Sequence, residues 1–180
     1  MKLDLTEILL RVGMRYPYEV SEPPIVDEDV ECVAPIDGKL IFTNTGEILL
    51  IEGNVETRAV LACSRCLTYF EDTLSVPIEE QFEIGTKLTG PKGRHTEIII
   101  EEDENPDAGK LFEGTLFNLT ELLRQGIMLA LPSQPLHDVA CKGLCASCGT
   151  NLNESSCACS HKSVNPAFAK LGALLEESSE

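Results

Sequence analysis

From about Val30 to Ile84, the apolar residues come in short β-branched and aromatic runs separated by polar turns. Runs of this length and composition are typical of β-strands. Two glycine-containing segments, "NTGE" and "EGN", interrupt the runs and predict hairpin turns. We therefore expect three or four antiparallel strands in a meander. A further short strand, "EIIIEE", is expected after the glycine-punctuated loop of residues 85–96.

A helical pattern replaces the β pattern at Asn118, where "NLTELLRQGIMLALP" predicts a helix over residues 119–131. Asn118 can cap this helix, Glu121 follows three residues later as in a capping box, and Pro132 ends it. The apolar residues fall on one stripe, which we expect to pack against the sheet rather than to bind a partner. This stripe consists of Leu119, Leu122, Leu123, Gly126, Ile127, Ala130 and Leu131.

The two ends of the chain carry weaker patterns. Residues 1–28 combine a short strand or helix with "SEPPIVDED", a proline-rich acidic connector. Near the other end, "NPAF" predicts a last helix with Pro166 in its first turn. Its inward-facing residues would be Phe168, Leu171, Leu174 and Leu175.

These elements predict an α+β fold: an antiparallel β-meander packed by one amphipathic helix, with a cysteine-rich, zinc-ribbon-like C-terminal module. We expect a β-rich core domain over residues 1–135. The cysteine-rich zinc module and the terminal helix would follow over residues 136–177 and pack on that core.

Composition agrees with a folded chain and limits its partners. The 180 residues are 43% hydrophobic and 24% charged, which suits a single buried core. The net charge of −16 disfavours tight nonspecific binding to bare RNA or DNA, because few counterions would be released. The acidic residues are best interpreted as a solvated surface that keeps the protein soluble.

Neither a signal peptide nor a membrane span is expected. The opening stretch "MKLDLTEILLRVGMRY" is interrupted by charges, and the longest apolar runs are too short to cross a bilayer. We therefore expect a soluble cytoplasmic protein. In that reducing compartment, eight cysteines indicate metal or redox chemistry rather than disulfides.

Two Cys-x-x-Cys pairs, Cys63/Cys66 and Cys145/Cys148, have the spacing of a zinc knuckle, in which two thiolates converge on one metal ion. Gly149 follows the second pair and allows the backbone angles that such a turn needs. Two further pairs supply more ligands. They are Cys157 with Cys159, and His137 with Cys141.

These residues form eight candidate ligands, enough for two tetrahedral sites. The assignment that we favour places Cys145, Cys148, Cys157 and Cys159 in one local site. It places Cys63, Cys66, His137 and Cys141 in a second site, which would tie the meander to the segment after the helix. A competing assignment joins the two Cys-x-x-Cys pairs in a single ribbon and leaves the other four ligands spare. Cys32, in a predicted strand, is interpreted as a small buried hydrophobic residue.

Three other uses of the cysteines compete with structural zinc. A redox dithiol at Cys63 and Cys66 would need a βαβ setting, whereas the pair lies between β-like runs. A disulfide framework does not suit a chain for which no signal peptide is expected, and an iron–sulfur cluster would use the same thiolates. Four-ligand, thiolate-rich sites leave no position for a catalytic water, so we expect structural zinc, two ions per chain, and no enzymatic activity.

Three segments together, "LACSRCLTYFE", "LPSQPLHDVACKGLCASCGTNLNESSCAC" and "NPAFAKL", resemble the YceD family, a bacterial and plastid group. The resemblance spans roughly residues 30–175. It implies a role in the accumulation and processing of large-subunit (23S) ribosomal RNA, and hence in ribosome assembly. Relatives without the later cysteines often keep the first pair with a residue like Cys141, which agrees with two sites. His137 departs from relatives that carry cysteine there.

Two kinds of partner would suit such a role. A few basic residues could touch large-subunit RNA directly: Arg65, Lys87, Lys92, Arg94, His95, Lys142 and Lys162. Alternatively, the acidic strands could dock onto a basic partner, either a ribosomal protein or an assembly factor. We favour the second hypothesis, since single exposed charges are usually only solvated.

Overall fold

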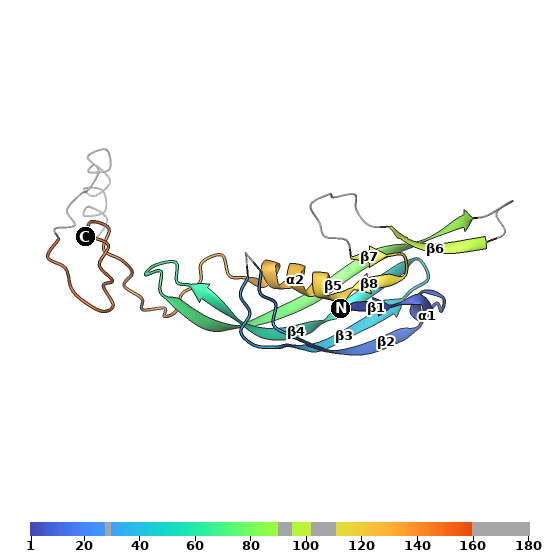
Figure 1. Cartoon of the computed structure of the whole chain (residues 1–180), viewed down its shortest axis with the longest axis horizontal. Coiled ribbons are helices and arrows are strands. Elements are labelled where there is room, and N and C mark those ends of the chain that lie inside the picture. Colours follow the sequence, from blue (N-terminus) through green and yellow to red (C-terminus); the bar gives the residue numbers. More distant parts are fainter. Residues whose placement is uncertain (28–29, 90–94, 102–110, 160–180) are drawn as a thin grey trace, which may run out of the picture. The chain divides into compact units, whose positions relative to one another are not determined.

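A computed structural model describes residues 1–27, 30–89, 95–101 and 111–159 of the chain (Figure 1). The chain divides into two compact units. The first contains Met1–Leu61 and Tyr69–Ser133, and the second contains Ala62–Thr68 and the residues from Gln134 onward. The sequence predicted a boundary after residue 135. It did not predict that the short segment Ala62–Thr68 would group with the second unit. The helix predicted from "NPAF" lies outside the described residues.

The first unit is built on a five-stranded sheet in the order β2-β3-β4-β5-β6, in which neighbours in sequence are neighbours in space. The pairs β2–β3, β3–β4 and β5–β6 are antiparallel, so the predicted antiparallel meander is confirmed. The bounds are Arg15–Glu22 for β2, Ile36–Asn44 for β3, Ile48–Ala62 for β4, Tyr69–Thr89 for β5 and His95–Glu101 for β6. Strand β2 was not predicted, whereas β6 contains most of the predicted "EIIIEE" strand.

The hairpin turn predicted at "NTGE" joins β3 to β4, but the turn predicted at "EGN" is wrong. Gly53 lies inside β4, opposite Leu40 of β3, and the strand continues through it. A Cβ atom at Gly53 would lie 2.0 Å from the Lys39 carbonyl oxygen. Glycine is therefore required here by the close approach of a neighbouring strand rather than by a turn.

Residues along β4 alternate between buried and exposed on either side of Gly53, so one face of the sheet is apolar. A second, three-stranded sheet in the order β1-β8-β7 contributes to the same core, with β1 at Lys2–Asp4, β7 at Phe112–Glu113 and β8 at Leu116–Asn118. A short helix, α1 (Thr6–Leu9), follows β1. Four phenylalanines contact one another edge-on or tilted in this core: Phe42, Phe82, Phe112 and Phe117.

Helix α2, Leu119–Ala130, packs against β5 and lies along the sheet in Figure 1. Its buried residues are Leu119, Leu122, Leu123 and Ile127, so the predicted core stripe is confirmed. Leu131, just before Pro132, has the extended angles φ −61° and ψ 129°. The helix therefore ends where the proline predicted.

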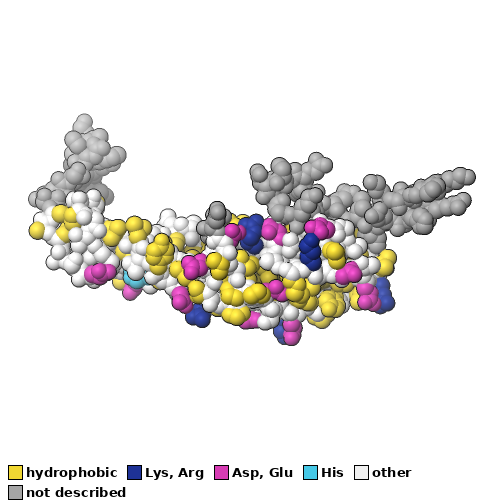
Figure 2. Space-filling model, viewed as in Figure 1, with side chains coloured by type: hydrophobic (Ala, Val, Ile, Leu, Met, Phe, Trp, Pro, Cys, Tyr) yellow, Lys and Arg dark blue, Asp and Glu magenta, His cyan; other side chains and the backbone are white. Residues whose placement is uncertain are grey.

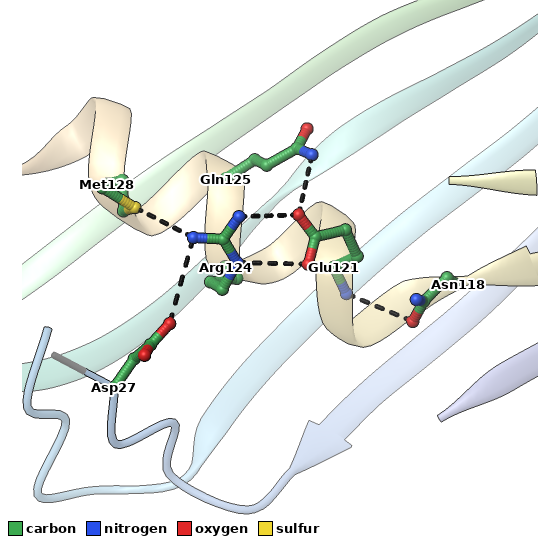
Figure 3. Close-up of polar contacts among 6 residues, drawn as sticks. All are labelled: Asp27, Asn118, Glu121, Arg124, Gln125 and Met128. Atoms are coloured by element: carbon green, nitrogen blue, oxygen red, sulfur yellow. Dashed lines mark hydrogen bonds and ion pairs between the residues drawn. The ribbon is translucent and has the colours of Figure 1, made fainter. Parts of the chain in front are cut away.

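The start of α2 differs from the predicted capping box in one respect (Figure 3). The Asn118 side chain accepts a hydrogen bond from the Glu121 amide, as predicted. The Asn118 amide, however, donates to the Leu111 carbonyl oxygen instead of to Glu121. The Glu121 carboxylate is bound instead by Arg124, at 2.8 and 3.1 Å, and by Gln125 at 2.9 Å. The Glu121 carboxylate therefore binds Arg124, one turn further along the helix, and does not accept a hydrogen bond from the Asn118 amide.

Charged side chains are scattered over the face of the described residues that Figure 2 shows. Figure 2 shows acidic groups spread over the visible face, interspersed with apolar ones. Among the described residues, no helix combines the length and apolar character that crossing a membrane would require.

Candidate metal centres

The segment Ala62–Thr68 forms a tight turn that presents Cys63 and Cys66. The Cys63 amide donates to the Thr68 carbonyl oxygen, and the Leu67 amide donates to the Cys63 carbonyl oxygen, each at 2.9 Å. Leu67 has a φ of 61°, a left-handed angle that is uncommon for a residue with a branched side chain. This left-handed residue directly follows Cys66, and the sulfur atoms of Cys63 and Cys66 lie within 4.8 Å of each other.

A second segment of the same unit, residues 134–141, is bonded to this turn. The Ser64 amide donates to the Pro135 carbonyl oxygen at 2.8 Å. The Arg65 guanidinium donates to the carbonyl oxygens of Val139, at 3.1 Å, and Cys141, at 2.9 Å. These bonds bring His137 and Cys141 to the cysteines of the turn.

The first cluster therefore consists of Cys63, Cys66, His137 and Cys141, whose donor atoms all lie within 4.8 Å of one another. Cys63 Sγ is 3.8 Å from Cys141 Sγ, and Cys66 Sγ is 3.4 Å from His137 Nδ1. The three cysteines are buried, whereas His137 is exposed. The histidine thus forms the solvent side of the cluster.

The second cluster is closed by a local turn. The Cys145 amide donates to the Thr150 carbonyl oxygen, the Gly149 amide donates to the Cys145 carbonyl oxygen, and the Ser147 amide lies 3.4 Å from Cys145 Sγ. Gly149 has a φ of 72°, as its position after the Cys-x-x-Cys pair predicts. The cluster consists of Cys145, Cys148, Cys157 and Cys159, again within 4.8 Å of one another.

In each cluster, one thiol has a lowered pKa and at least one other thiol has a raised pKa. Burial alone would raise the pKa of Cys63, but hydrogen bonds from His137 and from nearby backbone amides outweigh it and lower that pKa to about 5. Burial, together with the neighbouring sulfurs, raises the pKa of Cys141.

The second cluster follows the same rule. Hydrogen bonds from Thr150 lower the pKa of Cys148 to about 6, and the Cys148 sulfur raises the pKa of Cys159 to about 12. Sulfur atoms this close cannot all carry a negative charge unless a cation lies among them.

Both donor sets suit a metal ion. Each offers four soft or borderline ligands close enough to surround one cation, and amide N–H groups lie near sulfur as they do in zinc knuckles. The two clusters could therefore each hold a metal ion. The structure groups the eight residues as the favoured assignment does. It does not join Cys63 and Cys66 with Cys145 and Cys148, so the single-ribbon alternative does not describe the arrangement.

The predicted ribbon module has little regular structure in the described residues. Its β pairing there is one isolated antiparallel bridge, between Leu144 and Asn151. Cys32 belongs to neither cluster and lies in the core of the first unit, where it is 2% exposed. Burial raises the pKa of its thiol. These features agree with the interpretation of Cys32 as a small core residue.

The basic residues proposed for RNA contact differ from one another in their surroundings. Arg65 is engaged with backbone carbonyls in the first cluster, whereas Lys142 is exposed beside it. Lys87 and His95 lie in β5 and β6, and their side chains are not described. Lys92, Arg94 and Lys162 lie outside the described residues.

Sequence reasoning missed the polar residues that support the clusters. Asn153 Nδ2 donates to Cys141 Sγ at 3.3 Å, and the Thr150 hydroxyl lies 3.1 Å from Cys148 Sγ. The dense polar run "GTNLNES" between the cysteines was the only signal, and it did not say which sulfur each side chain would meet.

A known protein family matches more than half of the chain. The sequence model of the family described as "Large ribosomal RNA subunit accumulation protein YceD" matches residues 51–175, more than half of the chain. The chain belongs to the YceD family. All eight clustered residues lie within the matched range.

Two known proteins are similar to this chain. An uncharacterized protein of Mycobacterium leprae, ML1660, is 28% identical over 177 residues, which cover 96% of this chain and 76% of that protein. The "Large ribosomal RNA subunit accumulation protein YCED homolog 1, chloroplastic" of Arabidopsis thaliana is 28% identical over 144 residues, which cover 72% of this chain. The match spans only 45% of the Arabidopsis protein. No solved structure is significantly similar to this YceD-family chain.

Proposed function

We propose that this YceD-family protein is a non-enzymatic, zinc-binding factor that supports the accumulation and processing of 23S ribosomal RNA during assembly of the large ribosomal subunit. The observation that carries the proposal is the family match over residues 51–175, which includes both four-residue clusters. The name of the Arabidopsis relative supports the link to large-subunit RNA.

Zinc is the metal that the donor sets favour. Three cysteines with one histidine, and four cysteines, are common donor sets of structural zinc sites. Four protein ligands leave no position for a substrate or a catalytic water. Zinc bound in this way would hold together the turn Ala62–Thr68 and the segments that follow Gln134, and would take no part in a reaction.

A protein partner suits the chain better than bare RNA. With a net charge of −16, the protein would be repelled by phosphates over most of its surface. The guanidinium of Arg65, a predicted RNA contact, is already bound to two carbonyl groups. We therefore propose docking onto a basic ribosomal protein or assembly factor, with charge complementarity setting the association rate and the choice of partner.

Two observations bear on the alternative function, thiol redox or metal-dependent catalysis at Cys63 and Cys66: the lowered pKa of Cys63 favours it, whereas the burial of both thiols disfavours it. Cys63 is 0% exposed and Cys66 is 5% exposed, whereas exchanging thiols need access to their substrate disulfide. Rapid alkylation of Cys63 in the zinc-loaded folded protein, with turnover of a disulfide substrate, would favour the enzyme.

The proposed function is tested in cells that lack the endogenous protein. We expect reduced 23S ribosomal RNA and fewer large subunits in sucrose gradients, with rescue by the wild-type chain. The variant Cys63→Ser/Cys66→Ser should fail to rescue. Cys32→Ala, which changes a core cysteine outside both clusters, is the matched control and should rescue. Normal 23S levels in the depleted cells would contradict the role.

A further inference from the structure

The two clusters share one short stretch of chain. Lys142–Leu144 separates Cys141, in the first cluster, from Cys145, in the second. On one side, the Leu144 amide donates to the Arg65 carbonyl oxygen at 2.9 Å. On the other side, the Leu152 amide donates to the Gly143 carbonyl oxygen, also at 2.9 Å. The stretch is therefore bonded both to the turn of the first cluster and to a loop of the second.

Gly143 makes this double bonding possible. Its φ is 76°, and a Cβ atom there would lie 3.0 Å from the Arg65 carbonyl oxygen. A side chain at this position would be strained by the backbone angle and would crowd the turn. The close approach packs Gly143 directly against the turn of the first cluster.

Asn153 connects the second loop to a ligand of the first cluster. Its Nδ2 donates to Cys141 Sγ at 3.3 Å, and its Oδ1 accepts from the Lys142 amide at 2.8 Å. Asn151 Oδ1 accepts from the Asn153 amide at 3.1 Å and from Asn153 Nδ2 at 2.9 Å. Asn153 is thus oriented by its own loop and aimed at a sulfur of the other cluster.

That loop is closed by the second cluster. Residues 149–156 lie between Cys148 and Cys157, both members of the second cluster, and the Cys145 amide is bonded to the Thr150 carbonyl oxygen. A metal ion bound by both cysteines would hold the two ends of the loop together. Without that ion, the loop would regain conformational freedom and Asn153 would spend less time at Cys141.

We propose that Asn153 is a positioning residue for the first metal centre and that the second centre holds Asn153 in place, so that the two ions bind cooperatively. This inference rests on the proposed function only in requiring that both clusters bind a metal ion. Hydrogen bonds from outside the ligand set orient the ligands, and their loss costs about 10-fold to 100-fold in metal affinity. Because coupling is reciprocal, filling either centre raises the affinity of the other.

The first test compares Asn153 variants in the purified full-length protein. Zinc affinity is measured by competition with a chromophoric chelator. The sites are told apart with Co²⁺, since a site of three thiolates and one imidazole absorbs differently from a site of four thiolates. Asn153→Ala should weaken the first centre about 10-fold or more and shift its cobalt bands. Ser155→Ala is the control, because this exposed side chain has no hydrogen bond to the described part of the chain.

Asn153→Asp separates donation to sulfur from a merely structural role. An aspartate keeps an oxygen that can accept from the Lys142 amide, but it places a carboxylate oxygen against the sulfur in place of the amide donor. We expect the first centre of Asn153→Asp to bind zinc at least as weakly as the first centre of Asn153→Ala does. Wild-type affinity and unshifted cobalt bands in Asn153→Asp would overturn the positioning role.

The second test measures the coupling. Cys157→Ser/Cys159→Ser should lose one ion and bind the remaining one about 10-fold more weakly than the wild type does at that centre. Adding Asn153→Ala to this variant should lower the metal affinity of the first centre little further, because both changes act on the hydrogen bond from Asn153 to Cys141. Fully additive losses, or an unchanged first centre in Cys157→Ser/Cys159→Ser, would overturn the coupling. A wild-type protein that binds no metal would instead overturn the proposed function itself.

Discussion

Gly53 and Gly126 both lie where an added methyl group would meet a neighbour, but the neighbours differ. At Gly53, in β4, the nearest atom is the Lys39 carbonyl oxygen, 2.0 Å away, and a backbone atom can move only if the strands separate. At Gly126, in α2, the nearest atom is Ile78 Cδ1, 2.7 Å away, at the end of a side chain that can rotate. The two glycines therefore have different reasons to be there.

We expect Gly53→Ala to lower the free energy of unfolding by more than about 2 kcal/mol, since the added carbon forces β3 and β4 apart. Gly126→Ala should stay within about 1 kcal/mol of the wild type, because the gain in helix propensity offsets the repacking of Ile78. Urea unfolding followed by circular dichroism measures both. If both variants lost the same free energy of unfolding, β3 and β4 would not approach each other as closely as described.

At the scale of elements, α2 depends on a local charge network at its first turn (Figure 3). Hydrogen bonds from Arg124 lower the pKa of Glu121, against the opposing effect of burial, and Gln125 adds to the lowering. Arg124 also lies 4.0 Å from Asp27. A negative charge near the helix N-terminus is further favoured by the helix dipole.

This network predicts a pH dependence. Because folding lowers the pKa of Glu121 from its ordinary value of 4.5, its contribution is complete above that value and disappears as the pH falls through the folded pKa. Glu121→Gln should therefore cost about 0.5–1 kcal/mol at pH 7, and the difference from the wild type should shrink in acid.

Denaturant unfolding between pH 7 and pH 3 checks this prediction, with Glu52→Gln as the control on an exposed strand position. A cost for Glu121→Gln that is the same at pH 3 as at pH 7 would contradict the role of the charged carboxylate.

Elements with local signals could be predicted from the sequence, whereas contacts between distant segments could not. The ends of α2 follow from Asn118 and Pro132, which act on their immediate neighbours. Gly53 was misinterpreted as a turn because its real constraint is a carbonyl group of another strand. The capping-box prediction for Glu121 was also wrong in part, because its carboxylate accepts hydrogen bonds from Arg124 and not from the Asn118 amide.

In the candidate metal centres too, some features could be predicted from the sequence and others could not. Cysteine spacing was enough to favour the two groups of four that the structure brings together. It could not indicate that Asn153 donates to Cys141, since that bond depends on how the later loop folds back.

At the scale of the whole molecule, the net charge of −16 leads to a prediction about the partner. A protein with a net charge of −16 should bind naked large-subunit RNA weakly and bind a basic ribosomal protein or assembly factor strongly. A salt titration of binding, with and without large-subunit proteins present, measures both. Affinity for naked RNA that equals the affinity for the protein-containing particles, with a steep salt dependence, would contradict docking through a protein partner.

Two bound ions are proposed to hold the second unit together. The apparent free energy of structural zinc binding in small peptides is about 10–16 kcal/mol, comparable to the stability of a whole domain, so loss of a site should unfold the segments around it. The most direct measurement is elemental analysis of protein purified without added metal, repeated for Cys63→Ser and Cys145→Ser. We predict two zinc ions per wild-type chain and one in each variant. A metal-free wild-type chain that is fully folded would contradict the account.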